Sequence, residues 1–284
     1  MIIEKFFNID RESVQQMIEA TINMTHQKSG DNGFQNTKVF LLDEYAVLKT
    51  QNMNFRNVSN QDTDLNHFAG LAMTLLDLQA QGVNVVPILA FQSDNGNGYI
   101  IQPRAKGAEL YDKNKLSDKD YVLERVKFFS NVPQEHYDKF VADIIKIHDA
   151  DVIIDFVGKD NFFYDEAVGF QFVDLNAHFD YVYESTAEKP QGQGKHIKIA
   201  FLSCFMPLSH CPCYFVTMPK YGEIVSKLLS ELTKEEHIEL KENNKRIFEK
   251  CKTAVFNNGI AEEIVNETIT NDKFILKMQE LDLI

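Results

Sequence analysis

The stretch His148–Asn176, HDADVIIDFVGKDNFFYDEAVGFQFVDLN, decides the fold of this chain. Within it, apolar and β-prone runs alternate with short polar interruptions that contain Asp155, Asn161 and Asp174. Runs of this kind are typical of strands, and the polar residues between them are typical of loops and turns. The pattern therefore predicts a loop followed by a β-hairpin, with carboxylates held at one end.

Composition sets the size of the molecule and excludes some partners. The chain has 284 residues and 44% hydrophobic content, enough for one large domain or two unequal lobes with a sizeable core. Its formal net charge of −13 argues against wrapping nucleic acid or lying on an anionic membrane, because both surfaces would repel it. We therefore expect neither a nucleic-acid partner nor a membrane partner.

Two further features predict the compartment. No run of the sequence reaches the roughly 18 to 20 apolar residues that span a bilayer, and the N-terminus has no long apolar stretch. Four cysteines in so long a chain are too few for a disulfide framework. We expect a soluble, unprocessed protein of a reducing, cytoplasmic compartment.

The first third of the chain predicts helices and hairpins in turn. Residues 10–28 carry an apolar stripe of helical spacing that includes Val14, Ile18 and Ile22. Two β-prone runs, residues 39–42 and 45–48, flank a turn at Asp43-Glu44. The second run ends in Lys49, so a strand is predicted to present this lysine.

A second helix and a second hairpin are predicted next. Ser59 and Asp62 offer a cap to a helix with apolar residues every three or four positions, which Gly82 would close. Residues 83–91 and 98–102 then read as two strands around a polar turn.

From Pro103 the composition changes to predominantly helical patterns. Residues 117–131 and 134–148 predict helices, and the chain after the central hairpin is also expected to be mostly helical. One later helix should begin at the capping pair Thr233 and Glu236 and end near Gly259.

These elements, in this order, resemble the protein-kinase-like superfamily over most of residues 30–176. Lys49 ends the run YAVLK and is similar to the strand lysine of the V-A-I-K motif, while Asp155, Asn161 and Asp174 follow the order of the catalytic-loop Asp, its Asn and the Asp of D-F-G. The resemblance implies an α+β, two-lobed fold. A small antiparallel-sheet N-lobe with one helix would span residues 1–102, and a larger, mainly helical C-lobe would span residues 103–284.

The resemblance also implies an activity, the transfer of the γ-phosphoryl group of ATP to a hydroxyl acceptor on a protein or small molecule. Asp155 would be the catalytic base, and Lys159 would reach the transferred phosphate. Asn161 and Asp174 would supply hard oxygen ligands to Mg²⁺. Lys49 would hold the phosphates that are not transferred.

Further nucleotide contacts are expected from residues at matching positions. Gly30 and Gly33 would form a glycine loop over the phosphates, and Gln102 would belong to the hinge. Asp77 is the only acidic residue deep in the helix after Lys49, where the family has a glutamate. Glu109, in RAKGAEL, would bond the ribose, and its alternative role is that of a carboxylate at a helix start.

The departures from the family pattern keep other functions open. The glycine loop lacks the full G-x-G-x-x-G pattern, the span from Asp155 to Asn161 is one residue longer than in the family, and no A-P-E follows Asp174. A pseudokinase, which would bind a nucleotide or a protein without turnover, is therefore the second hypothesis. A third is an α+β interaction protein that does not bind nucleotide.

Two other clusters contain residue types that can bind metal ions, but their spacing favours other interpretations. Cys204, His210, Cys211 and Cys213 lack the paired spacing of zinc ligands, so buried or incidental thiols are the favoured interpretation. Asp149-Ala150-Asp151 follows a predicted helix and more plainly indicates a turn than a metal-binding D-x-D.

Overall fold

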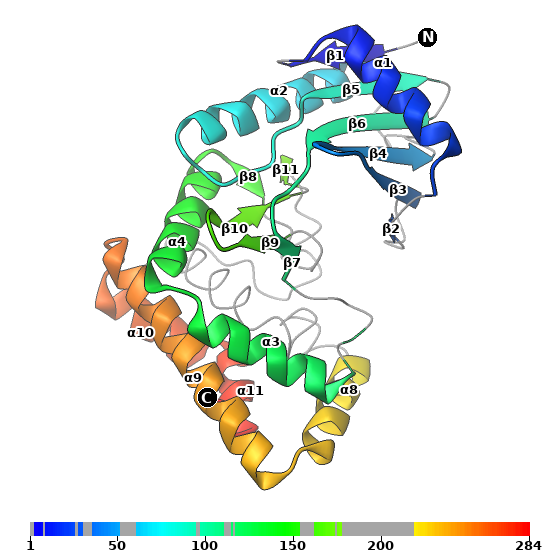
Figure 1. The fold of residues 1–284 in the computed structure, drawn as a ribbon. Helices are drawn as coiled ribbons and strands as arrows, with labels where there is room; N and C mark the ends of the chain where they lie inside the picture. Colours follow the sequence, from blue (N-terminus) through cyan, green and yellow to red (C-terminus); the bar gives the residue numbers. More distant parts are fainter. Residues whose placement is uncertain are drawn as a thin grey trace. The chain divides into compact units, whose positions relative to one another are not determined.

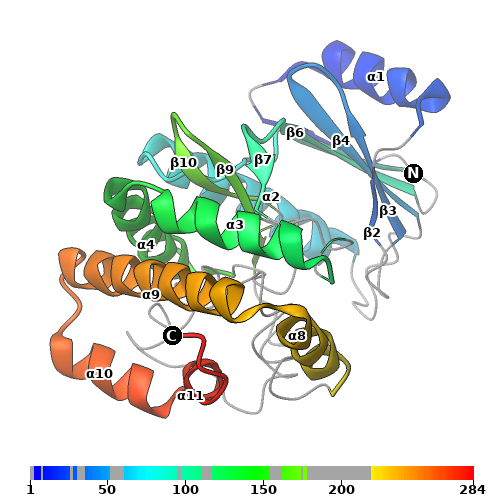
Figure 2. The same ribbon diagram turned by 60° about the horizontal axis from the view of Figure 1, so that its bottom comes forward.

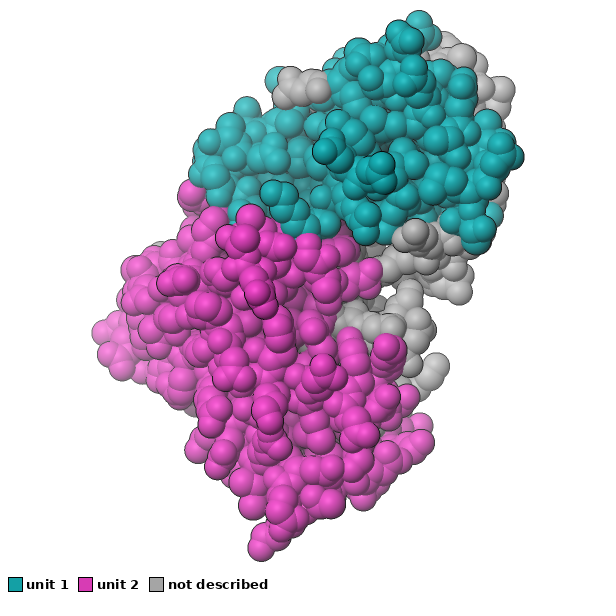
Figure 3. Space-filling model, in the orientation of Figure 1, with its two compact units in different colours: residues 1–106 teal, residues 107–284 magenta. Residues whose placement is uncertain are grey.

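The computed structural model describes residues 3–7, 9–25, 28–30, 36–51, 61–94, 97–110, 115, 117–153, 162–173, 175–177 and 219–284. The chain divides into two compact units, residues 1–106 (unit 1) and residues 107–284 (unit 2), which Figure 3 shows in different colours. The fold class is α+β, with an antiparallel sheet in unit 1 and mostly helical structure in unit 2. The expected division into lobes after residue 102 stays a prediction.

Unit 1 is built on a six-stranded antiparallel sheet (Figure 1). Its strands lie in the order β1 (Ile3–Phe6), β5 (Ala90–Asp94), β6 (Asn97–Pro103), β4 (Tyr45–Gln51), β3 (Asn36–Leu41) and β2 (Lys28–Gly30). The predicted hairpin around Asp43-Glu44 is confirmed: the amide of Leu42 donates to the carbonyl of Tyr45 across the turn, at 2.8 Å.

The predicted strand over residues 83–91 is wrong for most of its length. Only Ala90 and Phe91 belong to β5; Val83, Val85, Val86 and Ile88 are buried but lie outside the strands of the six-stranded sheet. The amide of Val85 instead donates to the carbonyl of Val83, at 2.9 Å, in a tight turn. Pro87 has no amide hydrogen to donate to a neighbouring strand. The apolar run around it is therefore buried without forming a strand.

Helix α1 (Arg11–Ala20) packs its apolar side on one face of the sheet. Val14 and Ile18 contact a buried core cluster whose sheet members are Phe40, Val47, Ala90 and Ile101. These four residues are direct cross-strand neighbours on β3, β4, β6 and β5, so they form one apolar row across the sheet. Side chains of directly paired residues share a face, which is why one short helix can bury them all.

The first helix is shorter than the predicted span of residues 10–28. Asp10 caps its start, where its carboxylate accepts from the amide of Ser13 at 2.8 Å. After Ala20 the chain tightens into a 3-10 turn, η1 (Thr21–Asn23), and the hydroxyl of Thr21 donates to the carbonyl of Ile18 at 2.7 Å. Ile22 is 73% exposed as a result, so its predicted place on the apolar stripe is wrong.

Helix α2 (Gln61–Ala80) ends at Gly82, as predicted. Gly82 has a φ of +78°, its amide donates to the carbonyl of Gln79, and the amide of Val83 donates to the carbonyl of Leu78. This pair of bonds is a Schellman motif, which needs a residue that tolerates positive φ.

Unit 2 contains the helices α3 (Lys119–Asn131), α4 (Gln134–Asp149), α8 (Pro219–Glu231), α9 (Lys234–Asn257), α10 (Glu262–Asn271) and α11 (Lys273–Glu280). Helix α9 packs along both α3 and α4 (Figure 2). The predicted helices over residues 117–131 and 134–148 are confirmed within two residues at each end. Helical structure after residue 218 is confirmed as well.

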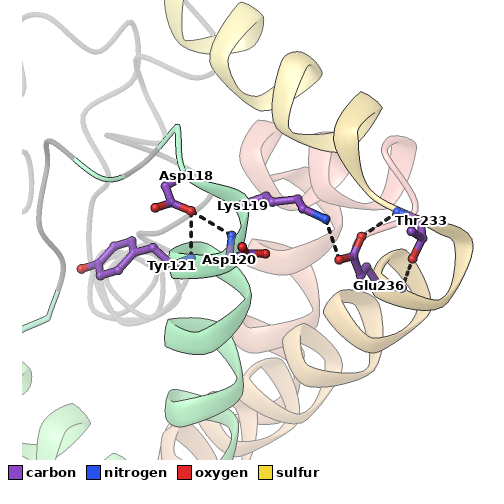
Figure 4. A network of polar contacts seen from close by, with 6 residues as sticks. All are labelled: Asp118, Lys119, Asp120, Tyr121, Thr233 and Glu236. Carbon is purple, nitrogen blue, oxygen red and sulfur yellow. Dashed lines mark hydrogen bonds and ion pairs between the residues drawn. The ribbon is translucent and has the colours of Figure 1, made fainter.

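The start of α9 is fixed by the predicted capping pair (Figure 4). The hydroxyl of Thr233 accepts from the amide of Glu236 at 3.2 Å, and the Glu236 carboxylate accepts from the amide of Thr233 at 2.7 Å. The same carboxylate binds Lys119 of α3 at 2.6 Å, next to Asp118, which caps α3. Glu236 therefore caps the start of α9 and also links this helix to α3.

Short strands accompany the helices of unit 2. A three-stranded sheet has the order β10 (Gly169–Phe172), β9 (Phe162–Asp165) and β7 (Ala108–Glu109), and a separate pair joins β8 (Val152–Ile153) to β11 (Asn176–Ala177). All pairings are antiparallel, so the predicted central hairpin is confirmed as β9–β10. The turn predicted at Asp149–Asp151 is also confirmed, since Asp151 follows α4 with a φ of 57°.

Candidate functional site

Lys49 lies near the end of β4, on the face of the sheet that α1 covers. It directly opposes Lys38 on β3 and Tyr99 on β6, and it is two residues from Val47 in the core cluster. Its ammonium lies 5.4 Å from the centroid of the Tyr99 ring, within the range of a cation–π contact. The half-exposed ammonium of Lys49 is thus held beside the ring of Tyr99 on the neighbouring strand.

Two other predicted nucleotide contacts lie on this sheet. Gly30 ends β2 opposite Thr37, and Thr37 in turn opposes Thr50, the neighbour of Lys49 in the chain. The structure therefore brings Gly30 and Lys49 to the same end of the sheet, about two strand spacings, or 10 Å, apart.

Gln102 belongs to the other face of the sheet. It opposes Ala46 on β4, three residues before Lys49, and alternation along a strand places these two side chains on opposite faces. The Gln102 side chain is 8% exposed. Within unit 1, the side chains of Lys49 and Gln102 are therefore not brought together, and a hinge role for Gln102 would rest on its backbone.

Asp77 lies on α2 with its side chain exposed, close in helical position to exposed Gly70 and Met73. The buried side of the helix is formed by Leu71, Leu75 and Leu78. Asp77 therefore belongs to the exposed side of α2, the side that the spacing of its neighbours predicts.

In unit 2, two strand pairings flank the acidic stretch that decides the fold. At the open end of the β9–β10 hairpin, Phe162 opposes Phe172, and in the second ladder Ile153 opposes Asn176. Asp155 follows Ile153 by two residues in the sequence, Asn161 immediately precedes Phe162, and Asp174 lies between Phe172 and Asn176. The calls on Asp155, Lys159, Asn161, Asp174 and Gly33 themselves fall outside the described residues.

An aromatic core supports this hairpin from the helix side. Phe140 of α4 stacks on Phe172 of β10, with ring centroids 5.4 Å apart and planes 3° from parallel, and it also contacts Phe162 and Phe170. Both strands of the hairpin are thus packed on α4. Because such contacts have specific geometry, they fix the register and the tilt of the hairpin.

Tyr164 of β9 adds a polar contact to this core. Its hydroxyl lies 2.9 Å from Nδ1 of His136 on α4, and burial, with Glu166 and Asp165 nearby, raises the pKa of the Tyr164 phenol. The raised pKa keeps the phenol neutral at physiological pH. We assign this contact a structural role, because it links the β9–β10 hairpin to α4.

Glu109 lies on β7 rather than at a helix start, so that alternative role is wrong. It is half-buried and directly opposes Phe163, which is also half-buried, on the same face of the three-stranded sheet. Glu109 is therefore presented by a strand whose partner, β9, starts at the residue after Asn161.

Sequence reasoning missed two residues that shape this part of unit 2. Gly107 approaches the backbone of Tyr164 closely, and Arg125 of α3 binds the carbonyl of Leu110. The glycine in RAKGAEL was a signal that could have been used, since an isolated glycine before a short β-prone run can mark a close backbone approach. Arg125 carries no such signal, because one arginine on a helix looks like any other.

No protein-family model matches this chain, and a search of curated proteins returned no match. Among the helices that the structure describes, none combines the length and the apolar character needed to cross a membrane. Within the same residues, no group of three or more His, Cys, Asp or Glu side chains is placed to bind a metal ion.

Proposed function

We propose that this protein is an ATP- and Mg²⁺-dependent phosphotransferase with a two-lobed, kinase-like fold, in which unit 1 is the N-lobe and unit 2 the C-lobe. The observation that carries the proposal is the pair of ladders in unit 2. Ile153 opposes Asn176 and Phe162 opposes Phe172, and these four positions flank Asp155, Asn161 and Asp174 in the sequence. A base, an amide and a carboxylate in this order are the groups that phosphoryl transfer requires.

Each residue has one role in the proposed reaction. Asp155 orients the acceptor hydroxyl and takes its proton as the phosphoryl group is transferred. Lys159 pairs with the transferred phosphate, and Lys49 with the phosphates that remain on the nucleotide. The oxygens of Asn161 and Asp174 are a hard donor set that fits Mg²⁺, which when bound neutralises phosphate charge.

The acceptor is proposed to be a hydroxyl on a small molecule or a protein. The absence of A-P-E after Asp174 in the sequence favours an acceptor site unlike that of peptide-directed kinases. With four cysteines and no disulfide framework expected, we place the reaction in the cytoplasm.

Two measurements test the proposal. ATP with Mg²⁺ should raise the melting temperature of the protein more than either one alone, since a ligand that binds only the folded state stabilises it. ATP turnover should then be lost in Asp174→Asn. Glu166→Gln is the matched control, because Glu166 is an exposed carboxylate in the turn at the far end of the β9–β10 hairpin. Full turnover in Asp174→Asn would reject the metal-ligand assignment.

A pseudokinase is the second candidate, and the exposed position of Asp77 on α2 favours it. The strand lysine of an active kinase is paired with an acidic residue of the following helix. Asp77 is the only acidic residue deep in α2, and it lies on the exposed side of that helix. A pseudokinase predicts nucleotide-induced stabilisation in the wild type without turnover, whereas an interaction protein unrelated to kinases predicts no effect of nucleotide.

A further inference from the structure

One cross-strand row of the unit 1 sheet carries two lysines side by side. Lys38 on β3 and Tyr99 on β6 are the direct partners of Lys49 on β4, so all three side chains leave the sheet on the same face. Directly opposed residues of an antiparallel pair have Cβ atoms about 4.5–5.5 Å apart. Because each ammonium sits on a long, flexible stem, both can reach a single anion.

No carboxylate among the residues that the structure describes forms an ion pair with either lysine. Helix α1 covers this face of the sheet and carries Glu12 and Glu19, but these carboxylates accept from glutamine side chains of the same helix, at 3.5 and 2.9 Å. Lys38 and Lys49 are both half-buried. They are thus neighbouring like charges whose repulsion an anionic ligand would relieve.

The ring of Tyr99 limits how far Lys49 can move away from Lys38. This ring packs against the core cluster of α1 and the sheet, and the Lys49 ammonium lies 5.4 Å from its centroid. The face of an aromatic ring attracts a cation without neutralising it, whereas a carboxylate would cancel its charge. Lys49 is therefore held in place with its full charge available to a ligand.

We propose that Lys38 is a second phosphate-binding residue, which acts together with Lys49 on one chain of two or more phosphates. This inference rests on the proposed function for the identity of the ligand, and it adds a residue to a role that the sequence gave to Lys49 alone. It also narrows the substrate class. A nucleoside diphosphate or triphosphate is preferred over a monophosphate, because each ammonium pairs with a different phosphate group.

Pyrophosphate tests the two-lysine site without a nucleotide. Titration calorimetry on the full chain at low ionic strength gives its dissociation constant, and a parallel titration uses ATP with Mg²⁺. Lys38→Met and Lys49→Met should each weaken the binding of both ligands about tenfold, the effect of losing a hydrogen bond to a charged group. Lys5→Met is the control, because Lys5 pairs with Phe91 and so lies on the other face of the sheet. Its affinities should stay at the wild-type values.

The stability of the ligand-free protein separates a binding role from a structural one. Lys38→Met should raise the melting temperature without ligand, since the repulsion is removed, and should weaken pyrophosphate binding at the same time. A lysine that only supported the sheet would change both quantities in the same direction. Lys38→Arg keeps a cation that binds phosphate, so its affinity for pyrophosphate should stay within about twofold of the wild type.

The role of Tyr99 is tested by a pair of variants. Tyr99→Leu removes the aromatic face and should weaken pyrophosphate binding about two- to fivefold, the fold-change that corresponds to a cation–π contact at an exposed site. Tyr99→Phe keeps the ring and should keep the affinity. An equal loss in both variants would show that the ring does not position Lys49.

The outcomes distinguish this inference from the proposed function. If Lys49→Met loses the binding of pyrophosphate and of ATP while Lys38→Met keeps both, the role of Lys38 is wrong and the proposed function stands. If pyrophosphate binds through both lysines but ATP with Mg²⁺ does not bind, the two-lysine site stands and the proposed function is wrong. If only ATP binds, its affinity in Lys38→Met decides the role of Lys38. If the wild type binds neither ligand, both proposals are wrong.

Discussion

Lys38 and Lys49 lie directly opposite each other on β3 and β4, on the face of the sheet that α1 covers. Like charges at directly opposed positions of an antiparallel pair repel, at a cost of roughly 0.2–1 kcal/mol. The Tyr99 ring beside Lys49 offsets part of this cost for one cation only. A phosphate close to both ammonium groups would remove the repulsion, so the pair suits the proposed anionic ligand.

Lys38→Met should therefore stabilise the protein without nucleotide at low ionic strength, by about 0.2–1 kcal/mol. The gain should shrink at high salt, because salt screens the repulsion that the substitution removes. Urea unfolding of both proteins at low and high salt measures this. Lys5→Met, at an exposed position on β1, is the control. A variant that is less stable at low salt would show that the two lysines do not repel.

Gly107→Ala should be much more destabilising than Gly82→Ala. Both glycines have positive φ, +77° and +78°, which costs an alanine roughly 1–2 kcal/mol. A Cβ at Gly82 meets nothing within 4 Å, whereas one at Gly107 overlaps the Tyr164 carbonyl and should add at least about 1–3 kcal/mol. Chemical unfolding of the two variants gives the difference, and equal losses would contradict the close approach of Gly107 to β9.

Glu236→Gln should destabilise the protein at neutral pH but not in acid. The hydrogen bonds from Lys119 and from the Thr233 amide hold the pKa of Glu236 below its ordinary value. The stability that the ionised carboxylate contributes is present above its unfolded-state pKa, and it is lost as pH falls through the lowered folded-state pKa. The difference in free energy of unfolding between wild type and variant should therefore disappear in acid.

The same ion pair also predicts how the stability of the protein changes at alkaline pH. The hydrogen bond to Glu236 raises the pKa of Lys119, so the contribution of this lysine is present at neutral pH and is lost only as pH rises through the raised value. Glu239→Gln provides the comparison, because its partner Lys127 is 62% exposed against 30% for Lys119. If Glu236→Gln and Glu239→Gln lower the free energy of unfolding equally, the capping role of Glu236 contributes nothing to stability.

Leu283→Ala should cost about 2–5 kcal/mol, the range for a leucine removed from a packed core. Leu283 is fully buried, and its amide donates to the carbonyl of Met278 at the end of α11. Leu276→Ala on α11, the helix that ends just before Leu283, is the control: its side chain is 46% exposed, so the change should stay within about 0.5 kcal/mol. Thermal unfolding distinguishes the two, and similar melting temperatures would contradict the burial of Leu283.

The sequence predicted the elements whose signals are local. The turn at Asp43-Glu44, the end of α2 at Gly82 and the cap formed by Thr233 and Glu236 each depend on a few adjacent residues, and each is confirmed. Ile22 was misplaced because α1 gives way to a 3-10 turn at Thr21, and the apolar periodicity of the sequence does not reveal this change.

Non-local pairings could not be predicted in this way. Strand β1 exists because it pairs with β5, more than eighty residues away, and β7 has only two residues and exists because β9 lies beside it. The candidate site shares this limit. Glu109 could be singled out by its position, but the strand that presents it and the anchoring role of Arg125 arise only from tertiary contacts.

The chain passes from unit 1 to unit 2 once, between two fixed points. On one side the amide of Arg104 donates to the carbonyl of Glu44 at 2.8 Å, and on the other Gly107 meets the backbone of Tyr164. Each unit is thus an unbroken length of polypeptide, joined through Ala105 and Lys106. A ligation junction at these two residues would let one half carry isotope labels, so that NMR spectra could report on either half separately.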